Sequence, residues 1–162
     1  MLIVVVDVND RPKRQRVVAL PLPDMQLQGT ISFSLANLSF LSMLNLENNN
    51  FHGGIPFVLG HLPRLFLNLR NNSLTGIIPP SVGNATKLMN FSLAGNRISG
   101  SLPKEIGNLS QLSTLSLYDN QLIGSIPAPL FNISSLLLAT LALNSLSGSL
   151  LLNKIKNTFL ER

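Results

Sequence analysis

The sequence of 162 residues contains no cysteine, no tryptophan and only two histidines, His52 and His61. The absence of cysteine excludes disulfides, cysteine zinc sites and a thiol nucleophile. The two histidines share no helical face and no serine has a visible base beside it, so we predict neither a metal site nor a hydrolytic centre. Protein kinase motifs are also missing, namely the Gly-rich loop, the lysine strand and the HRD and DFG elements. We therefore expect no enzyme activity and no cofactor.

Charged residues make up 12% of the sequence, and the net charge of +5 is unevenly distributed. Residues 17–152 hold five basic and four acidic side chains, so this part is nearly neutral. We interpret the basic excess in the tails as a solvated arm and predict no nucleic-acid surface. The tail cations are Arg11, Lys13, Arg14, Arg16, Lys154, Lys156 and Arg162.

Long apolar runs are absent as well. No run reaches the roughly 18 residues that a membrane span requires. Residues 1–8 are apolar but lack the basic start and the cleavage site of a signal peptide, and a stray strand is the better interpretation. We predict no membrane-spanning segment and no convincing signal peptide in this chain.

The sequence does contain a repeat of 23 or 24 residues, most regular at residues 109–132. A fixed period of this length is typical of a solenoid. Leu115 and Leu117 are two positions apart, which predicts a strand with one face in the core and one in solvent. Further strands are expected at the same place in the other repeats, all in one parallel sheet: 43–47, 66–70, 90–94, 114–118 and 138–142.

Each expected strand is followed by an asparagine and then by a glycine. An asparagine amide both donates and accepts, so a column of them can satisfy the backbone groups of buried turns. The glycines suit turns with positive φ, and the prolines that follow stand where no ladder hydrogen bond should form. The ladder asparagines are Asn49, Asn72, Asn96, Asn120 and Asn144, and the glycines are Gly29, Gly53, Gly76, Gly100, Gly124 and Gly148.

The repeat boundaries predict three parts. Residues 1–16 form an irregular basic segment, residues 17–152 an array of about six repeats, and residues 153–162 a tail or short cap. The repeat at residues 62–84 is one residue short, which predicts a kink or a local misregister there.

The pattern LxxLxxLxLxxNxLxGxIPxxLGN, seen in GNLSQLSTLSLYDNQLIGSIP, resembles the plant-type leucine-rich repeat over residues 17–152. The chain is similar to the ectodomains of plant leucine-rich-repeat receptor-like serine/threonine kinases. QRVVAL and QLQGTIS resemble the first repeats of the subfamily that includes the bacterial elongation-factor and flagellin receptors. The resemblance implies an α/β solenoid, a horseshoe with a parallel β-sheet on its concave face and loops or short 3-10 turns on its convex face.

The resemblance also implies a membrane-anchored parent whose kinase domain and transmembrane helix are not in this chain, and an extracellular or cell-surface location. Family members usually carry a cysteine pair near a tryptophan in an N-terminal cap, and this sequence has neither. We expect that cap to be absent or degraded.

Side chains that alternate with the core leucines should project from the concave face and bind a protein or peptide ligand, with a co-receptor as a further partner. Phe66, Arg70 and Tyr118 are the expected anchors, because aromatic and arginine side chains carry most of the energy at interfaces. The candidate binding residues are Asn45, Glu47, Phe66, Asn68, Arg70, Asn90, Ser92, Thr114, Ser116, Tyr118, Asp119 and Thr140.

Six asparagines begin the glycosylation motif N-x-S/T. Four of them are copies of one repeat position, so a turn role explains those four equally well, whereas Asn71 and Asn90 are independent of the repeat. The candidate glycosylation sites are Asn37, Asn71, Asn84, Asn90, Asn108 and Asn132.

Two functions remain open. The first is a non-catalytic recognition module of a receptor-kinase ectodomain, used in signal perception including defence. The second is a soluble structural or inhibitory repeat protein, or a truncated gene product. A signal peptide upstream or a kinase exon downstream in the gene would separate the two.

Overall fold

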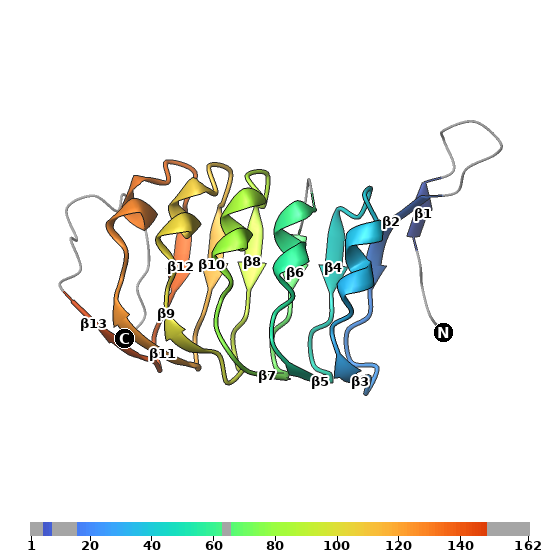
Figure 1. Cartoon of the computed structure of the whole chain (residues 1–162), viewed down its shortest axis with the longest axis horizontal. Helices are drawn as coiled ribbons and strands as arrows, with labels where there is room; N and C mark the ends of the chain where they lie inside the picture. Colours follow the sequence, from blue (N-terminus) through green and yellow to red (C-terminus); the bar gives the residue numbers. More distant parts are fainter. Residues whose placement is uncertain (1–4, 8–15, 63–65, 149–162) are drawn as a thin grey trace.

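Seven strands form the main sheet, in the order β1-β2-β4-β6-β8-β10-β12 (Figure 1). The computed structural model describes residues 5–7, 16–62 and 66–148. From β2 onward each strand is parallel to its neighbours, whereas β1 pairs antiparallel with β2. The strands are β1 (Val5–Asp7), β2 (Arg16–Pro21), β4 (Met43–Asn45), β6 (Phe66–Asn68), β8 (Asn90–Ser92), β10 (Thr114–Ser116) and β12 (Leu138–Thr140).

The predicted parallel sheet is confirmed, and β4 to β12 begin at the expected residues. Each of these strands has three residues where five were expected. The strands are short because the chain turns soon afterwards through a residue with positive φ, such as Asn48 at +55° and Asp119 at +56°. Such a conformation is incompatible with a continuing strand.

Two short parallel sheets run along the lower edge of the molecule in Figure 1, one in the order β3-β5-β7 and the other β13-β11-β9. Their strands lie in the segments that follow the asparagine position of each repeat, where the first repeat has Met25. Their strands are β3 (Gln28–Thr30), β5 (Asn50–Gly53), β7 (Ser73–Leu74), β9 (Ser99–Ser101), β11 (Gln121–Ser125) and β13 (Ser145–Ser147).

Short 3-10 helices form the layer in front of the main sheet in Figure 1, and the described residues contain one in each of the first five repeats. Pro56, Pro79, Pro103 and Pro127 each stand just before a helix with φ between −63° and −70°, the range that the proline ring imposes. The predicted 3-10 turns are thus present. The helices are η1 (Phe33–Asn37), η2 (Phe57–His61), η3 (Pro80–Asn84), η4 (Lys104–Asn108) and η5 (Ala128–Asn132).

The misregister expected beside the short third repeat is wrong. Strand β6 pairs residue for residue with both neighbours, Phe66 opposite Met43 on β4 and opposite Asn90 on β8. A slip by one residue would turn Leu67 out of the core, so the strand keeps its register. The residue that this repeat lacks is therefore missing from a part of the repeat outside β6. The kink was expected in the same repeat, residues 62–84, of which residues 63–65 lie outside the described residues, so it stays a prediction.

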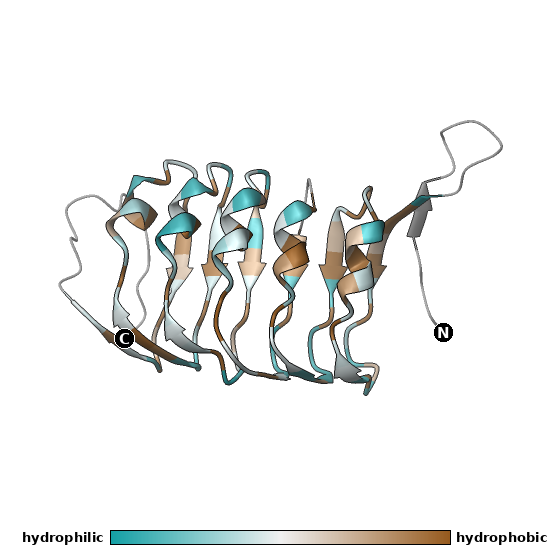
Figure 2. Cartoon of the chain, viewed as in Figure 1, coloured by the Kyte–Doolittle hydropathy of each residue, from teal (hydrophilic) through white to brown (hydrophobic). Residues whose placement is uncertain are grey.

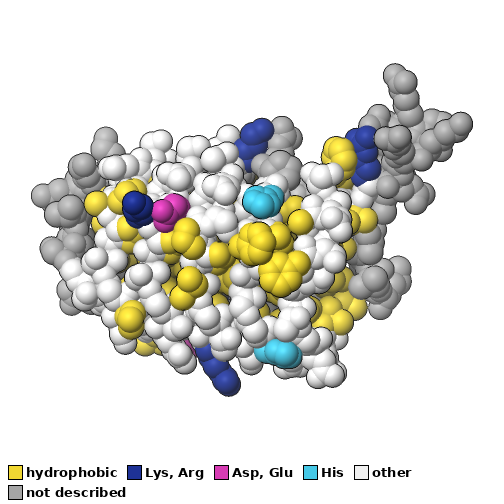
Figure 3. Space-filling view, viewed as in Figure 1, with side chains coloured by type: hydrophobic (Ala, Val, Ile, Leu, Met, Phe, Trp, Pro, Cys, Tyr) yellow, Lys and Arg dark blue, Asp and Glu magenta, His cyan; other side chains and the backbone are white. Residues whose placement is uncertain are grey.

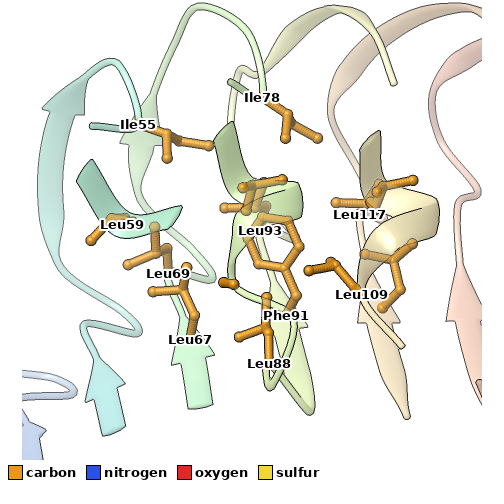
Figure 4. Close-up of a cluster of buried hydrophobic side chains, with 14 of the residues drawn as sticks. Ile55, Leu59, Leu67, Leu69, Ile78, Leu88, Phe91, Leu93, Leu109 and Leu117 are labelled. Carbon is orange, nitrogen blue, oxygen red and sulfur yellow. The ribbon is translucent and has the colours of Figure 1, made fainter. Parts of the chain in front are cut away.

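The core is a continuous column of leucine and isoleucine side chains between the sheet and the helices. Along each coil, apolar and polar residues alternate (Figure 2). Figure 4 shows Phe91, which replaces a repeat leucine, among Leu67, Leu88, Leu93 and Leu109 from its own coil and its neighbours. Phe91 is fully buried, so the larger ring is accommodated inside the column.

The asparagine after each strand connects two successive coils. The Nδ2 of Asn96 donates to the carbonyls of Leu93 at 2.9 Å in its own coil and Leu69 at 3.0 Å in the preceding coil. Its Oδ1 accepts the N–H of Leu74 at 3.0 Å. The same hydrogen bonds recur at Asn49, Asn72, Asn120 and Asn144.

The glycine after each ladder asparagine has the positive φ that the sequence predicted, for example 78° at Gly124. A second set of glycines, Gly60, Gly83 and Gly107, lies near the end of the 3-10 helices. A Cβ on Gly83 would be 2.3 Å from the carbonyl oxygen of Glu105 in the next coil. Successive helices therefore stack closely only because these positions lack a side chain, a requirement that the sequence analysis missed.

Strand β1 confirms the stray strand expected in residues 1–8, and it pairs with β2 through Val6 opposite Val17. Next to it, the guanidinium carbon of Arg16 lies 4.0 Å from the centroid of the Phe40 ring. The predicted boundaries at residues 16 and 152 stay predictions, and the predicted C-terminal cap lies outside the described residues. Among the described residues, no helix has the length and apolarity to span a membrane.

We predict that Gly83→Ala lowers the free energy of unfolding by about 1–3 kcal/mol, because the new methyl group overlaps the backbone of the next coil. Gly54→Ala is the matched control, since the nearest atom to its Cβ would be the Thr75 oxygen at 3.9 Å. Its effect should stay within about 0.5 kcal/mol. Urea unfolding measures both, and equal effects would show that the helix layer tolerates wider spacing.

We also predict that Asn96→Asp costs about 2–3 kcal/mol in urea unfolding. The carboxylate loses the Nδ2 donor, so the carbonyls of Leu69 and Leu93 keep only the hydrogen bonds from Asn72 and Asn120. It also places a negative charge beside these carbonyl oxygens in a buried turn. Asn108→Asp, at an exposed helix end, is the control and should change stability by less than about 0.5 kcal/mol. A similarly small effect at position 96 would contradict the importance of the ladder.

Candidate binding face

The side chains of β4 to β12 that point away from the core form what we call the open sheet face. Because side chains alternate along a strand, the residues before and after the buried central one lie on this face, as does the residue two positions beyond the strand. Parallel pairing in register aligns them in three columns. The first column is Met43, Phe66, Asn90, Thr114 and Leu138; the second is Asn45, Asn68, Ser92, Ser116 and Thr140; the third is Glu47, Arg70, Ala94, Tyr118 and Ala142.

The second column is polar throughout, and several of its side chains bond within the face. Thr140 Oγ1 donates to Ser116 Oγ at 2.9 Å. Asn45 Oδ1 accepts the N–H of Glu47 at 3.0 Å, and Asn68 Oδ1 that of Arg70 at 3.2 Å. These contacts hold the two amides in place on the face.

One charged cluster lies on the face, at Glu47, Asn68 and Arg70. Asn68 Nδ2 donates to Glu47 Oε2 at 2.9 Å, and Arg70 Nε lies 3.9 Å from Glu47 Oε1. The Arg70 side chain is 55% exposed and Glu47 27% exposed, so water screens this ion pair. The guanidinium is therefore positioned by its neighbours and still accessible to a ligand.

A hollow of about 700 Å³ lies at the edge of the face where β6 and β8 begin. Phe66 and Asn90 come from the first column. The others precede the strands by one to three residues, a position that the sequence analysis did not consider. The lining residues are Ser42, Phe66, Lys87, Met89, Asn90, Gln111 and Ser113.

The structure brings most of the sequence-predicted binding residues together on this face. Tyr118, 43% exposed, and Arg70 project from the third column, and Phe66 is half-buried in the first. Ser92 is buried, and so contributes a surface too small for more than one contact. Asp119 lies beyond the strand in the turn with positive φ. The remaining seven lie on or directly beside the strands: Asn45, Glu47, Asn68, Asn90, Thr114, Ser116 and Thr140.

The six N-x-S/T asparagines occupy three different environments. Asn71 donates from Nδ2 to Asn48 Oδ1 at 2.7 Å, so its amide already has a structural partner. Asn90 lines the hollow, so a glycan there would occupy the space offered to a ligand, and its two predicted roles exclude each other. The other four, Asn37, Asn84, Asn108 and Asn132, are exposed at the last residue of η1, η3, η4 and η5.

The bond made by Asn71 belongs to a second amide column that the sequence analysis missed. Asn48 Nδ2 donates in turn to Asp24 Oδ1 at 2.8 Å. All three residues have positive φ, between 52° and 57°. Gly95 follows in the same column, and a Cβ there would be 2.3 Å from Asn71 Oδ1. The signal was present, because Asn, Asp or Gly precedes most of the ladder asparagines.

The described residues contain no cluster of three or more His, Asp or Glu side chains that could hold a metal ion. His52 and His61 are both exposed and lie on different elements, β5 and η2. Among the described residues, the face offers hydrogen-bonding groups, the rings of Phe66 and Tyr118 and the accessible guanidinium of Arg70.

Stacked parallel strands, 3-10 helices and asparagine-bridged turns define a leucine-rich-repeat solenoid. The family model described as Leucine Rich Repeat matches four segments, residues 40–62, 65–85, 87–109 and 111–133. The chain belongs to the leucine-rich-repeat family.

The relatives are receptor kinases and receptor ectodomains of plants. The LRR receptor-like serine/threonine-protein kinase EFR of Arabidopsis thaliana is 49% identical over 53 residues, 33% of this chain and 5% of EFR. The plant peptide hormone receptor RGFR1, solved in complex with RGF2, is 33% identical with a TM-score of 0.79, covering 83% of this chain and 22% of that chain. The BIR3–SERK2 complex of Arabidopsis thaliana contains a chain that is 34% identical with a TM-score of 0.74, covering 88% of this chain and 76% of that one.

This chain therefore resembles the ectodomains of leucine-rich-repeat receptor-like kinases, and spans a small part of EFR and RGFR1. Their matched regions are repeat arrays and include no kinase domain.

We predict that Arg70→Ala changes the free energy of unfolding by less than about 0.5 kcal/mol, because its ion pair with Glu47 is exposed. The neighbouring residue Leu69 is fully buried, and Leu69→Ala should cost about 2–5 kcal/mol. Chemical denaturation of the two variants tests this. A large loss with Arg70→Ala would mean that the guanidinium holds the coils together and is not free for a partner.

Proposed function

We propose that the chain is a non-catalytic recognition module of a receptor-kinase ectodomain, and that its open sheet face binds a peptide or a protein segment. The observation that carries the proposal is the combination of three aligned columns with a hollow at their edge. An extended peptide laid across the strands would run along the columns and meet the side chains of a new strand about every 4.8 Å.

The face suits a ligand of mixed chemistry. Ser116, Thr140 and Asn68 supply hydrogen-bonding groups to a peptide backbone, and Arg70 supplies one cation for a carboxylate. In the hollow, Phe66 and Met89 are apolar while Lys87 is cationic, and Lys87 has no ion-pair partner among the described residues. A side chain with an apolar body and an acidic end fits this combination best.

The relatives support a peptide or protein partner. RGFR1 was solved with the peptide RGF2, and BIR3 was solved with SERK2. By analogy, a co-receptor is a further partner of the parent protein, and signal perception, including defence, is its role. The array described here presents five strands from β4 to β12, and we expect its footprint to fall below the roughly 800 Å² per partner of a stable complex. We expect this segment alone to bind weakly.

An extracellular or cell-surface location is part of the proposal, and it predicts glycans. Asn37, Asn84, Asn108 and Asn132 lie on the helix side, opposite the open sheet face, where sugars would leave the binding surface free. Asn71 is the poorest acceptor because its amide bonds to Asn48. Asn90 should stay unmodified if the hollow receives a ligand.

The proposal is tested by selecting peptides from a random library against the secreted chain and measuring their affinity for variants. Tyr118→Ala and Arg70→Ala should each weaken binding by more than about 1 kcal/mol, since both side chains project from the third column. Lys104→Ala, on η4 at the opposite side, is the control and should have no effect. Peptides that lose affinity with Lys104→Ala and keep it with the other two variants would place the binding site elsewhere.

A further inference from the structure

Two aromatic side chains are exposed together on the helix side. Phe33 is 61% exposed and Phe57 is 55% exposed, and they are the first residues of η1 and η2. Their ring centroids lie 5.7 Å apart with the ring planes inclined by 49°. In the view of Figure 3, which faces the helices, apolar side chains gather around η2 beside a histidine. Two exposed aromatic rings in contact form an apolar patch that is a candidate binding surface.

An exposed N-x-S motif ends the same helix that Phe33 begins, because Asn37 is the last residue of η1 and is followed by Leu38 and Ser39. The next helix shows how far a side chain at this position reaches. In η2, His61 stands where Asn37 stands in η1, and its ring lies 6.4 Å from the ring of Phe57, edge to face. A group attached to Asn37 has the same relation to Phe33.

We propose that Phe33 and Phe57 form a carbohydrate platform that holds the first N-acetylglucosamine residues of an N-glycan on Asn37. The inference rests on the extracellular location in the proposed function. The C–H groups on one face of a sugar ring carry a small positive charge, and an aromatic face is negative, so the two attract while both apolar surfaces leave water. Because the sugar is tethered at Asn37, its effective concentration at the rings is high, and a weak contact suffices.

The pattern of the other helices explains why this patch belongs to the Asn37 glycan. His61 stands in place of the candidate glycosylation asparagine in η2, so no sugar grows directly beside Phe57, which is 55% exposed. Asn84 lies in the coil after Phe57, but its own helix η3 begins with Pro80, so its glycan has no aromatic ring at the position that Phe33 has relative to Asn37. Glycans at Asn37 and Asn84 would flank the patch and keep a protein partner away from it.

The test uses the full chain secreted from eukaryotic cells, with glycan occupancy determined by mass spectrometry. Ser39→Ala removes the motif at Asn37 without changing that asparagine, and Thr86→Ala does the same for Asn84. We expect Ser39→Ala to lower Tm by about 2 °C, the size of one aromatic contact in a chain of this length. In a Phe57→Ala background the same change should have less than half that effect. The shift caused by Thr86→Ala should be independent of Phe57.

Proton NMR of the glycan gives a second readout that does not depend on stability. Ring currents should move the signals of the Asn37-linked sugar upfield in the wild-type chain, and Phe33→Ala together with Phe57→Ala should return them to the values seen for the Asn84 glycan. Equal Tm shifts in both backgrounds, together with unshifted sugar signals, would overturn the platform while leaving the proposed recognition function intact.

Occupancy separates the remaining outcomes. If Asn37 carries no glycan while Asn84 and Asn108 are occupied, the platform is overturned and the proposed recognition function is not. If none of the candidate sites carries a glycan in the secreted chain, both the platform and the extracellular part of the proposed function fail. Binding of free chitobiose to the Ser39→Ala chain, without any contact by the attached glycan in the wild type, would reassign the rings to carbohydrate from another molecule.

Discussion

The hydrogen bonds of the ladder asparagines are the interaction on which the rest of the structure depends. Each repeat turns sharply after its strand, and the turn leaves backbone carbonyls and N–H groups inside the molecule with no sheet partner. The amide of Asn96 meets this need in two coils at once, since it donates to Leu93 and Leu69 and accepts from Leu74. A single coil buries too little apolar surface to offset the entropy of ordering its backbone, so this coupling between coils is a condition of folding.

The ladder also determines what the two sides of the molecule can do. It holds the strands in register, which aligns the columns of the open sheet face, the surface that we propose for recognition. On the opposite side, Gly83 and its equivalents let the 3-10 helices stack closely. The helix ends then present Asn37, Asn84, Asn108 and Asn132 in one row. Binding groups and candidate glycan sites are thus separated by the core between them.

Much of this architecture could be predicted because a period of 23 or 24 residues appears directly in the sequence. Leu115 and Leu117 predicted the strand and its buried face, and β10 begins at the expected residue, Thr114. The residue missing from the repeat at residues 62–84 predicted a kink or a local misregister. The misregister was wrong, since β6 stays in register with its neighbours. The second amide column of Asp24, Asn48 and Asn71 was not predicted, because the position before the ladder asparagine varies between Asp, Asn, Gly and Leu from repeat to repeat.

The sequence by itself determined the solenoid, its parallel sheet, its 3-10 layer and the columns from which binding residues come, because each follows from a spacing within one repeat. Only the tertiary structure decided which side chains from different repeats meet. The hollow that combines Phe66 with Lys87 and Gln111, and the pair formed by Phe33 and Phe57, join residues more than 20 positions apart. Their contact depends on how adjacent coils stack and which way each side chain turns, and no spacing within a repeat specifies that.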